Sequence, residues 1–330
     1  MKKIVIVLLL LFIKVNASVV VMDADSNRVL YSSNMNERKL IASTTKVMTS
    51  LIALDMGSLD DKITIGEEIL KVNGSMIYVK QGETFTLNDL LHGLMLQSGN
   101  DAAMSIATKY GYEDFIANMN IKAFKLGMYN TNFENPHGLN DETKNYSTAY
   151  DLAVLMSYAI KNKDFLKITQ ARRYKVDKYI WVNKNKLLSE YKYLISGKIG
   201  YTKASGQVYV SSAKKNGKTL VIASIDEADK FNLHKRLYEE YFEKYEKYKL
   251  LDKYFISFKI NDGENNHYYL KKDINVLLRP DEIKNIKLKI DLNQKCVLVL
   301  LNEDVILKER LYKISYKKRV SKIKELLLFR

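Results

Sequence analysis

Three short motifs in the sequence carry side chains that can perform serine acyl transfer. Ser43-Thr44-Thr45-Lys46 comes first, Ser98-Gly99-Asn100 follows, and Lys198-Ile199-Gly200 comes last. One such motif alone is weak evidence, because the S-x-x-K pattern also begins at other serines of the chain, none of which has the other two motifs placed around it. The ordered set therefore predicts one site built from three separate segments.

Ser43 is the candidate nucleophile and Lys46 is its candidate base. The two residues are three positions apart at the start of a helix predicted over 44–56, so their side chains share one face. A serine hydroxyl is a weak nucleophile until a base takes its proton. Lys46 can act as that base if burial and a second cation lower its pKa, and Lys198 is the candidate for the cation. The alternative interpretation of Ser43 is an ordinary helix cap.

The second motif is expected in a loop at the edge of the site. There Ser98 relays protons between Lys46 and a leaving group, while the Asn100 amide binds a carbonyl of the substrate backbone. A loop that ends in a helix cap at Asn100 or Asp101 is the plainer interpretation, and both can hold.

The third motif lies at the start of a predicted hairpin strand. Strand alternation places Lys198, Gly200 and Thr202 on one side, so that an extended substrate can lie along the strand edge. Taken alone, K-x-G also fits a plain edge strand with a solvated lysine.

The three motifs together resemble those of the low-molecular-mass penicillin-binding proteins of the D-alanyl-D-alanine carboxypeptidase family. The resemblance extends over most of residues 18–245 and includes the segments 97–102, 136–139, 146–152 and 183–188. It implies an α/β (α+β) fold: a β-lactamase/transpeptidase-like domain with a five-stranded antiparallel sheet and a helical cluster. A small β-rich domain and a basic C-terminal helix are expected to follow.

The same resemblance implies removal of the terminal D-alanine from peptidoglycan stem peptides through an acyl-enzyme on Ser43. β-Lactams are then expected to acylate the same serine. The resemblance also assigns the Thr202 N–H, with that of Ser43, to the oxyanion hole. Lys230 stands where the family has an arginine that binds the substrate carboxylate, and lysine keeps the charge but lacks the bidentate fork.

Ile199 departs from the family pattern, which has a threonine at this position. In the family, the hydroxyl of that threonine helps to hold the substrate. Losing one charge-assisted hydrogen bond costs about 1.5 to 3 kcal/mol, or roughly 10- to 150-fold in binding or rate. Thr202 is expected to compensate in part.

Three other functions remain as alternatives. A D,D-endopeptidase that cleaves cross-links uses the same catalytic residues. A β-lactamase is disfavoured because no deacylating glutamate is evident. A non-catalytic cell-wall-binding or scaffold protein is the third alternative, with Ile199 as the sign of lost activity.

No cofactor and no metal site are expected. The four histidines are scattered at 92, 137, 234 and 267, and no H-E-x-x-H motif is present. His137 is therefore expected to be a structural loop residue.

Two hairpins and a set of helices must position these motifs. Hairpin strands are predicted at 19–22 with 28–31 and at 207–212 with 219–224, the second around Asn216-Gly217. Helices are predicted at 44–56, 87–96, 101–110, 113–126 and 149–161, and a charged helical stretch at 233–249. We expect a catalytic domain over 18–249 and a β-rich domain over 250–315, with strands at 254–260, 267–270 and 287–292.

The N-terminus has the pattern of a secretory signal over residues 1–17. Lys2 and Lys3 precede the apolar run 4–13, and Ala17 ends a small-residue cleavage site. The alternative is an uncleaved anchor, but the run is much shorter than the ~20 residues needed to span a bilayer. The protein is thus expected outside the cytoplasm, in the periplasm or on the outer face of the cytoplasmic membrane. The lone Cys296 lies in an apolar run, which favours a buried structural residue.

The strongly basic charge indicates an anionic partner. Removal of the signal, with Lys2, Lys3 and Lys14, lowers the formal net charge from +15 to +12. Nucleic acid fits poorly with export, whereas anionic lipid headgroups or acidic cell-wall polymers fit well. The tail 316–330 has the pattern of a basic amphipathic helix, which suits either an anionic membrane surface or packing against the β-rich domain.

Overall fold

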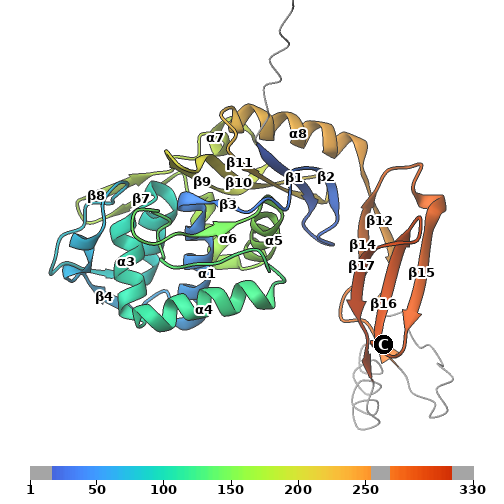
Figure 1. The fold of residues 1–330 in the computed structure, drawn as a ribbon, viewed down its shortest axis with the longest axis horizontal. Helices are drawn as coiled ribbons and strands as arrows, with labels where there is room; N and C mark the ends of the chain where they lie inside the picture. The colour runs from blue at the N-terminus through green and yellow to red at the C-terminus, as the bar shows by residue number, and fades with distance from the viewer. Residues whose placement is uncertain (1–16, 254–267, 314–330) are drawn as a thin grey trace, which may run out of the picture.

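The computed structural model describes residues 17–253 and 268–313, which form a large α/β unit and a smaller β unit beside it (Figure 1). The predictions for 1–16, for the strand at 254–260 and for the tail 316–330 lie outside the described residues. Within the described residues, no helix combines the length and apolarity that crossing a bilayer requires.

A five-stranded antiparallel sheet forms the centre of the large unit, as predicted. Its order is β2-β1-β11-β10-β9. The two predicted hairpins are confirmed, and at the turn of the second both Asn216 (φ 51°) and Gly217 (φ 75°) adopt positive φ, as a type I′ turn requires. The bounds of the strands are β1 Ser18–Asp23, β2 Val29–Ser33, β9 Leu194–Thr202, β10 Gly206–Lys215 and β11 Lys218–Ile225. Because β9 is an edge strand, one of its sides is free of a strand partner.

Both faces of the sheet are buried, which explains the continuous apolar runs in its strands. In β1, Val20 and Met22 belong to the core under the helical cluster, whereas Val19 and Val21 belong to the core under α8 (Lys230–Lys244). The cluster contains α1 Lys46–Met56, α2 Leu87–His92, α3 Asn100–Lys109, α4 Tyr112–Lys125, α5 Ala149–Ala159 and α6 Lys163–Gln170. The large unit is thus a sheet between two helical layers.

Three predicted helices have different ends in the structure. The segment predicted at 44–56 begins as a 3-10 turn, η1 (Ala42–Thr45), before α1. The segment predicted at 87–96 ends in a π-helical turn, η3 (Gly93–Gln97). The stretch predicted at 233–249 is helical only to Lys244 and continues as β12 (Glu246–Leu251), because its last residues pair with β14 (Ile274–Leu278).

Short elements complete the large unit. They are β3 Lys39–Leu40, β4 Lys62–Thr64, η2 Glu67–Lys71, β5 Thr84–Thr86, β6 Tyr146–Ser147, β7 Arg173–Val176, β8 Tyr179–Val182 and α7 Leu187–Glu190.

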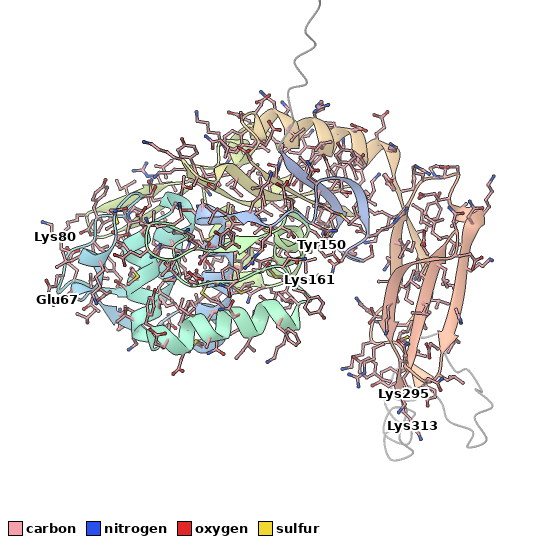
Figure 2. The ribbon with its side chains drawn as sticks, in the orientation of Figure 1. Glu67, Lys80, Tyr150, Lys161, Lys295 and Lys313 are labelled. Carbon is pink, nitrogen blue, oxygen red and sulfur yellow. The ribbon has the colours of Figure 1, made fainter. Side chains whose placement is uncertain are left out.

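The smaller unit consists of short sheets around their own core. Strands β15 (Ile286–Asp291), β16 (Cys296–Leu301) and β17 (Asp304–Arg310) form a three-stranded sheet. β13 (Tyr268–Tyr269) pairs with β18 (Tyr312–Lys313), and the turn η4 (Ile283–Asn285) precedes β15. Cys296 is buried, as predicted. Figure 2 shows Lys295 and Lys313 at one end of this unit.

The β1–β2 hairpin holds the two units together. The Arg28 guanidinium binds the Glu282 carboxylate through two hydrogen bonds of 2.8 and 3.1 Å, and it also donates to the Leu277 carbonyl at 2.6 Å. Both charged side chains are nearly buried, with 9% and 8% exposed. Paired bonds of this kind fix orientation as well as contact.

Candidate active site

The proposed nucleophile lies where η1 meets α1. Ala42, just before Ser43, has a positive φ of 45°, and this kink turns the serine out of the line of the helix. Gly138 makes the kink possible, because a Cβ on this residue would lie 1.9 Å from the Ala42 carbonyl oxygen. The Ser43 Oγ then lies 3.0 Å from the Lys46 Nζ, which confirms the reach expected from their spacing.

Lys46 is fully buried and has three oxygen neighbours, none of them a carboxylate. Its Nζ lies 2.7 Å from the Asn100 Oδ1 and 2.6 Å from the His137 carbonyl oxygen, in addition to the Ser43 contact. A neutral amine has two N–H donors and one lone pair. If the donors go to Asn100 and His137, the lone pair is left to receive the Ser43 proton.

The electrostatic surroundings favour the neutral form of Lys46. Burial is the main cause that holds its pKa well below the usual value, and the charges of Lys198 and Lys184 lower it further. Asp101 acts in the opposite direction. Lys198 is therefore the cation that the sequence predicted, and Lys184 is a second one.

Lys198 is the second buried lysine of the site. Its Nζ donates to the Ser98 Oγ at 2.8 Å and to the Ile199 carbonyl at 2.9 Å. Burial, and then the charge of Lys184, lowers the pKa of Lys198 to about 7. It can therefore exchange a proton with Ser98 near neutral pH.

The second motif forms a tight turn between two helices. The π-helical turn ends at Ser98, which has a left-handed φ of 67°, and α3 begins at Asn100. Ser98 is bonded to Lys198 rather than to Lys46. The Asn100 amide accepts from Lys46 and donates to the Asn73 carbonyl at 2.5 Å. It therefore positions the lysine, and the expected contact with a substrate carbonyl stays a prediction.

Asp101, which the sequence offered only as a possible helix cap, holds a loop of the site in place. Its buried carboxylate accepts from the backbone N–H groups of Ile77 and Tyr78, at 3.0 and 2.8 Å. This pins the loop whose Ser75 carbonyl accepts from the Asn100 N–H at 2.7 Å. The available signal was an acidic residue directly after S-G-N.

Strand β9 passes very close to the nucleophile. A Cβ on Gly200 would lie 2.9 Å from the Ser43 nitrogen, so glycine is needed for this approach. The expectation for Thr202 is wrong, because its N–H already donates to the Ser205 Oγ at 3.0 Å in the turn toward β10. Backbone alternation directs the preceding N–H, that of Tyr201, to the free edge of the strand instead.

Lys230 and Ile199 lie on the α8 side of the sheet. Lys230 begins α8, and its Nζ donates to the Gln207 Oε1 at 2.7 Å. Gln207 pairs with Tyr201, so Lys230 is near the far end of β9 and makes no described contact with Ser43 or Lys46. Ile199 is partly buried and packs against the core under α8. Its apolar packing replaces the hydroxyl usual in the third motif.

Lys184 is a residue that the sequence reasoning missed. Its backbone N–H donates to the Leu96 carbonyl, just before the second motif. The side chains of its neighbours are fixed: Asn183 donates to the Ala171 carbonyl, and Asn185 accepts from the Tyr209 hydroxyl. The segment 183–188 stood out in the sequence, but nothing in it indicated that Lys184 lowers the pKa of two other lysines.

Comparisons with known proteins identify the family of the chain. The model of the D-alanyl-D-alanine carboxypeptidase family matches residues 13–229. The D-alanyl-D-alanine carboxypeptidase DacF of Bacillus subtilis is 38% identical over 210 residues, which cover 60% of this chain and 54% of DacF. The chain thus spans about half the length of that relative.

Solved structures are similar as well. The D-alanyl-D-alanine carboxypeptidase of Mycobacterium tuberculosis is 33% identical with a TM-score of 0.65, over 68% of this chain and 90% of that one. Penicillin binding protein 5 of Haemophilus influenzae, at 24% identity, shares the fold over 90% of this chain and 96% of its own, with a TM-score of 0.76. Since the family model matches well over half of the sequence, the chain belongs to the D-alanyl-D-alanine carboxypeptidase family of serine peptidases.

Proposed function

We propose that the protein is a serine D-alanyl-D-alanine carboxypeptidase that trims peptidoglycan stem peptides. One observation carries the proposal: a buried lysine 3.0 Å from a serine hydroxyl, held by two carbonyl-type oxygens and no carboxylate. A carboxylate at that place would keep the lysine charged and unable to take a proton. The arrangement therefore favours activation of Ser43.

The first half of the reaction forms an acyl-enzyme. Lys46 takes the Ser43 proton as the Oγ attacks the carbonyl of the penultimate D-alanine. The N–H groups of Ser43 and Tyr201 stabilise the oxyanion. The C–N bond then breaks, and the terminal D-alanine leaves as an amine after receiving a proton through Ser98 from Lys198.

The second half of the reaction releases the peptide. The proton on Lys46 first passes to Lys198, so that Lys46 is neutral and Lys198 is charged again. A water molecule then gives a proton to Lys46 as its oxygen attacks the acyl carbon, and Lys46 returns that proton to the Ser43 Oγ as the acyl bond breaks. Gly200 and Thr202 belong to the strand along which the substrate lies. Lys230, near the far end of that strand, supplies a cation for the C-terminal carboxylate of the substrate. β-Lactams would acylate Ser43 by the same first step.

The location of the enzyme is part of the proposal. We infer export through the signal at 1–17, and attachment of the tail 316–330 to an anionic membrane surface. The basic charge of the chain supports this second inference. Cell fractionation of the full chain and of a chain that ends at residue 315 tests it. Equal membrane fractions for the two chains would refute the role of the tail.

Two measurements test the activity. The purified protein is treated with a fluorescent penicillin and followed by intact mass, with Ser43→Ala as the control. Release of D-alanine from a stem pentapeptide is measured in parallel. Stoichiometric label on the native protein alone, together with D-alanine release, is the expected result. A folded native protein that takes no label would instead favour a non-catalytic wall-binding protein.

A further inference from the structure

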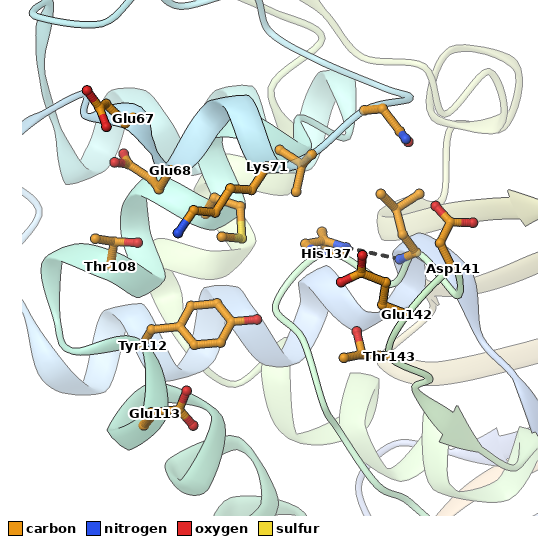
Figure 3. A pocket seen from close by; sticks show the side chains of 14 residues that line it. Glu67, Glu68, Lys71, Thr108, Tyr112, Glu113, His137, Asp141, Glu142 and Thr143 are labelled. Carbon is orange, nitrogen blue, oxygen red and sulfur yellow. Dashed lines mark hydrogen bonds between the residues drawn. The ribbon is translucent and has the colours of Figure 1, made fainter.

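A cavity of about 1010 Å³ is lined in part by His137, whose backbone carbonyl accepts from the catalytic lysine (Figure 3). Its walls come from η2, α3, the start of α4 and the loop after His137. Two wall residues also hold the catalytic groups: the His137 carbonyl accepts from Lys46, and the Asn73 carbonyl accepts from Asn100. A group bound in the cavity is thus separated from Lys46 by a single residue, His137.

The cavity is anionic although the protein is strongly basic. Carboxylates in its wall outnumber the single ammonium, that of Lys71; they are Glu67, Glu68, Glu113, Asp141 and Glu142. Glu68 is occupied by the Ser105 hydroxyl and the Gly66 N–H. Among the described residues, the other four carboxylates take part in no ion pair. Because the chain as a whole has a net charge of +15, this local excess of negative charge favours a cationic ligand for the cavity.

His137 provides a separate indication of a ligand. The side chain is more than nine-tenths buried and forms part of the cavity wall. Its Nδ1 accepts from the Leu139 N–H at 3.1 Å, so in the neutral ring the proton is on Nε2. Burial lowers the pKa of His137 to about 3, which keeps the ring neutral. In the described part of the chain, this Nε2–H donor has no hydrogen-bond partner.

The chemistry of the walls selects the kind of ligand. In the described part of the chain, no three His, Cys, Asp or Glu side chains converge as metal ligands, and Figure 3 shows the carboxylates spread around the cavity. Spread carboxylates fit an ammonium on a flexible chain. The unpaired His137 donor fits an amide carbonyl in the same ligand.

Charge also decides which end of a peptide enters. The C-terminal carboxylate of the substrate is repelled by this anionic cavity and attracted to the lysines of the site, where the charge of Lys184 acts on both Lys46 and Lys198. A part of the substrate that enters the cavity therefore belongs to the acyl side of the cleaved bond and carries positive charge.

We propose that this cavity binds a primary amine on the side chain of the residue that precedes the two D-alanines of the substrate. The inference rests on the proposed function and adds a specificity to it. The enzyme would then prefer stem peptides whose side-chain amine is free over peptides in which that amine is already acylated, as it is in a cross-link. The enzyme would therefore act before that amine is acylated in a cross-link.

The test compares two peptides that differ only in this amine. They are Nα-acetyl-L-Lys-D-Ala-D-Ala and its Nε-acetylated form, and kcat/KM for D-alanine release is measured for both. An ammonium beside partly exposed carboxylates is worth up to about 1 kcal/mol, so we expect a preference of about fivefold for the free amine, which weakens with salt.

A pair of neighbouring residues supplies a matched control. Glu113 lines the cavity, whereas Asp114, which is also exposed in the first turn of α4, does not. Glu113→Gln, alone and with Glu142→Gln, should reduce the preference toward one, while Asp114→Asn should leave it unchanged. Acylation by benzylpenicillin, which has no amine, should be the same in all of these proteins.

The outcomes separate the two proposals. Equal rates for the two peptides, or a preference that survives Glu113→Gln with Glu142→Gln, would overturn the role of the cavity while penicillin still labels Ser43. A native protein that penicillin does not label would overturn the proposed function itself. Loss of the preference only in the Glu113 and Glu142 variants would support the inference.

Discussion

The contact between Lys46 and Asn100 allows a sharp test of the protonation state of the base. Asn100→Asp places a negative charge 2.7 Å from the Lys46 Nζ with almost no change of shape. Two unit charges at this distance attract by about 6 kcal/mol at an effective dielectric constant of 20. The pKa of Lys46 should therefore rise by about four units. Lys46 would then be charged at neutral pH.

A charged Lys46 cannot take the Ser43 proton, so acylation should fall. Because each pKa unit above the working pH removes about tenfold of the neutral amine, we expect acylation by benzylpenicillin at pH 7 to fall by more than about tenfold. Relative to the native protein, the rate should recover by about tenfold per pH unit as pH rises toward the new pKa. The measurement is the second-order acylation rate constant from pH 6 to 10.

The control is Asn100→Ala, which removes the same hydrogen bonds without adding charge. Its loss of activity should be independent of pH. Thermal unfolding shows whether either variant is folded, since the lost bond to the Asn73 carbonyl costs about 1 to 3 kcal/mol of stability. A pH-independent loss in folded Asn100→Asp would refute the assignment of neutral Lys46 as the base.

Three further predictions follow from the same contacts. For the native protein, kcat/KM should decline on the alkaline side with an apparent pKa near 7, as Lys198 loses its proton. Lys184→Gln should move this alkaline limb to higher pH, because a positive charge near Lys198 is removed; an unmoved limb would show that Lys184 does not influence Lys198. Ile199→Thr should raise kcat/KM on a stem peptide by about tenfold through a regained hydrogen bond, at a stability loss of about 1 kcal/mol in thermal unfolding; an unchanged rate would show that the hydroxyl does not reach the substrate. Gly138→Ala should lower the free energy of unfolding by at least about 2 kcal/mol and abolish acylation, since its Cβ collides with the Ala42 carbonyl; near-native stability in urea unfolding would contradict the packing argument.

Local patterns predicted the parts of the fold that local forces decide. The Asn216-Gly217 hairpin is an example, since a two-residue turn with positive φ sets the pairing of the strands on each side. Helix ends were predicted less well. Whether residues 42–45 continue α1 as an α-helix depends on Gly138, which is far away in the sequence and packs against Ala42.

Tertiary contacts also decided the strand that follows α8. Residues from Glu246 onward can continue a charged helix by pattern alone, yet they pair with β14 of the smaller unit. A nearly buried ion pair between Arg28 and Glu282 holds that unit in place, and its partners come from opposite ends of the chain. Periodicity within one segment contains no information about such a partner.

The sequence by itself determined which residues could perform the chemistry. Residue type and spacing, together with the resemblance to the penicillin-binding family, identified Ser43, Lys46, Ser98, Asn100 and Lys198, and the structure brings all five together. Only the tertiary structure decided what each one does. Burial and the charges of Lys184 and Lys198 set the pKa of Lys46, and the Thr202 N–H is engaged elsewhere. The physical reason is that pKa values and free donors depend on neighbours in space, which come from distant parts of the chain.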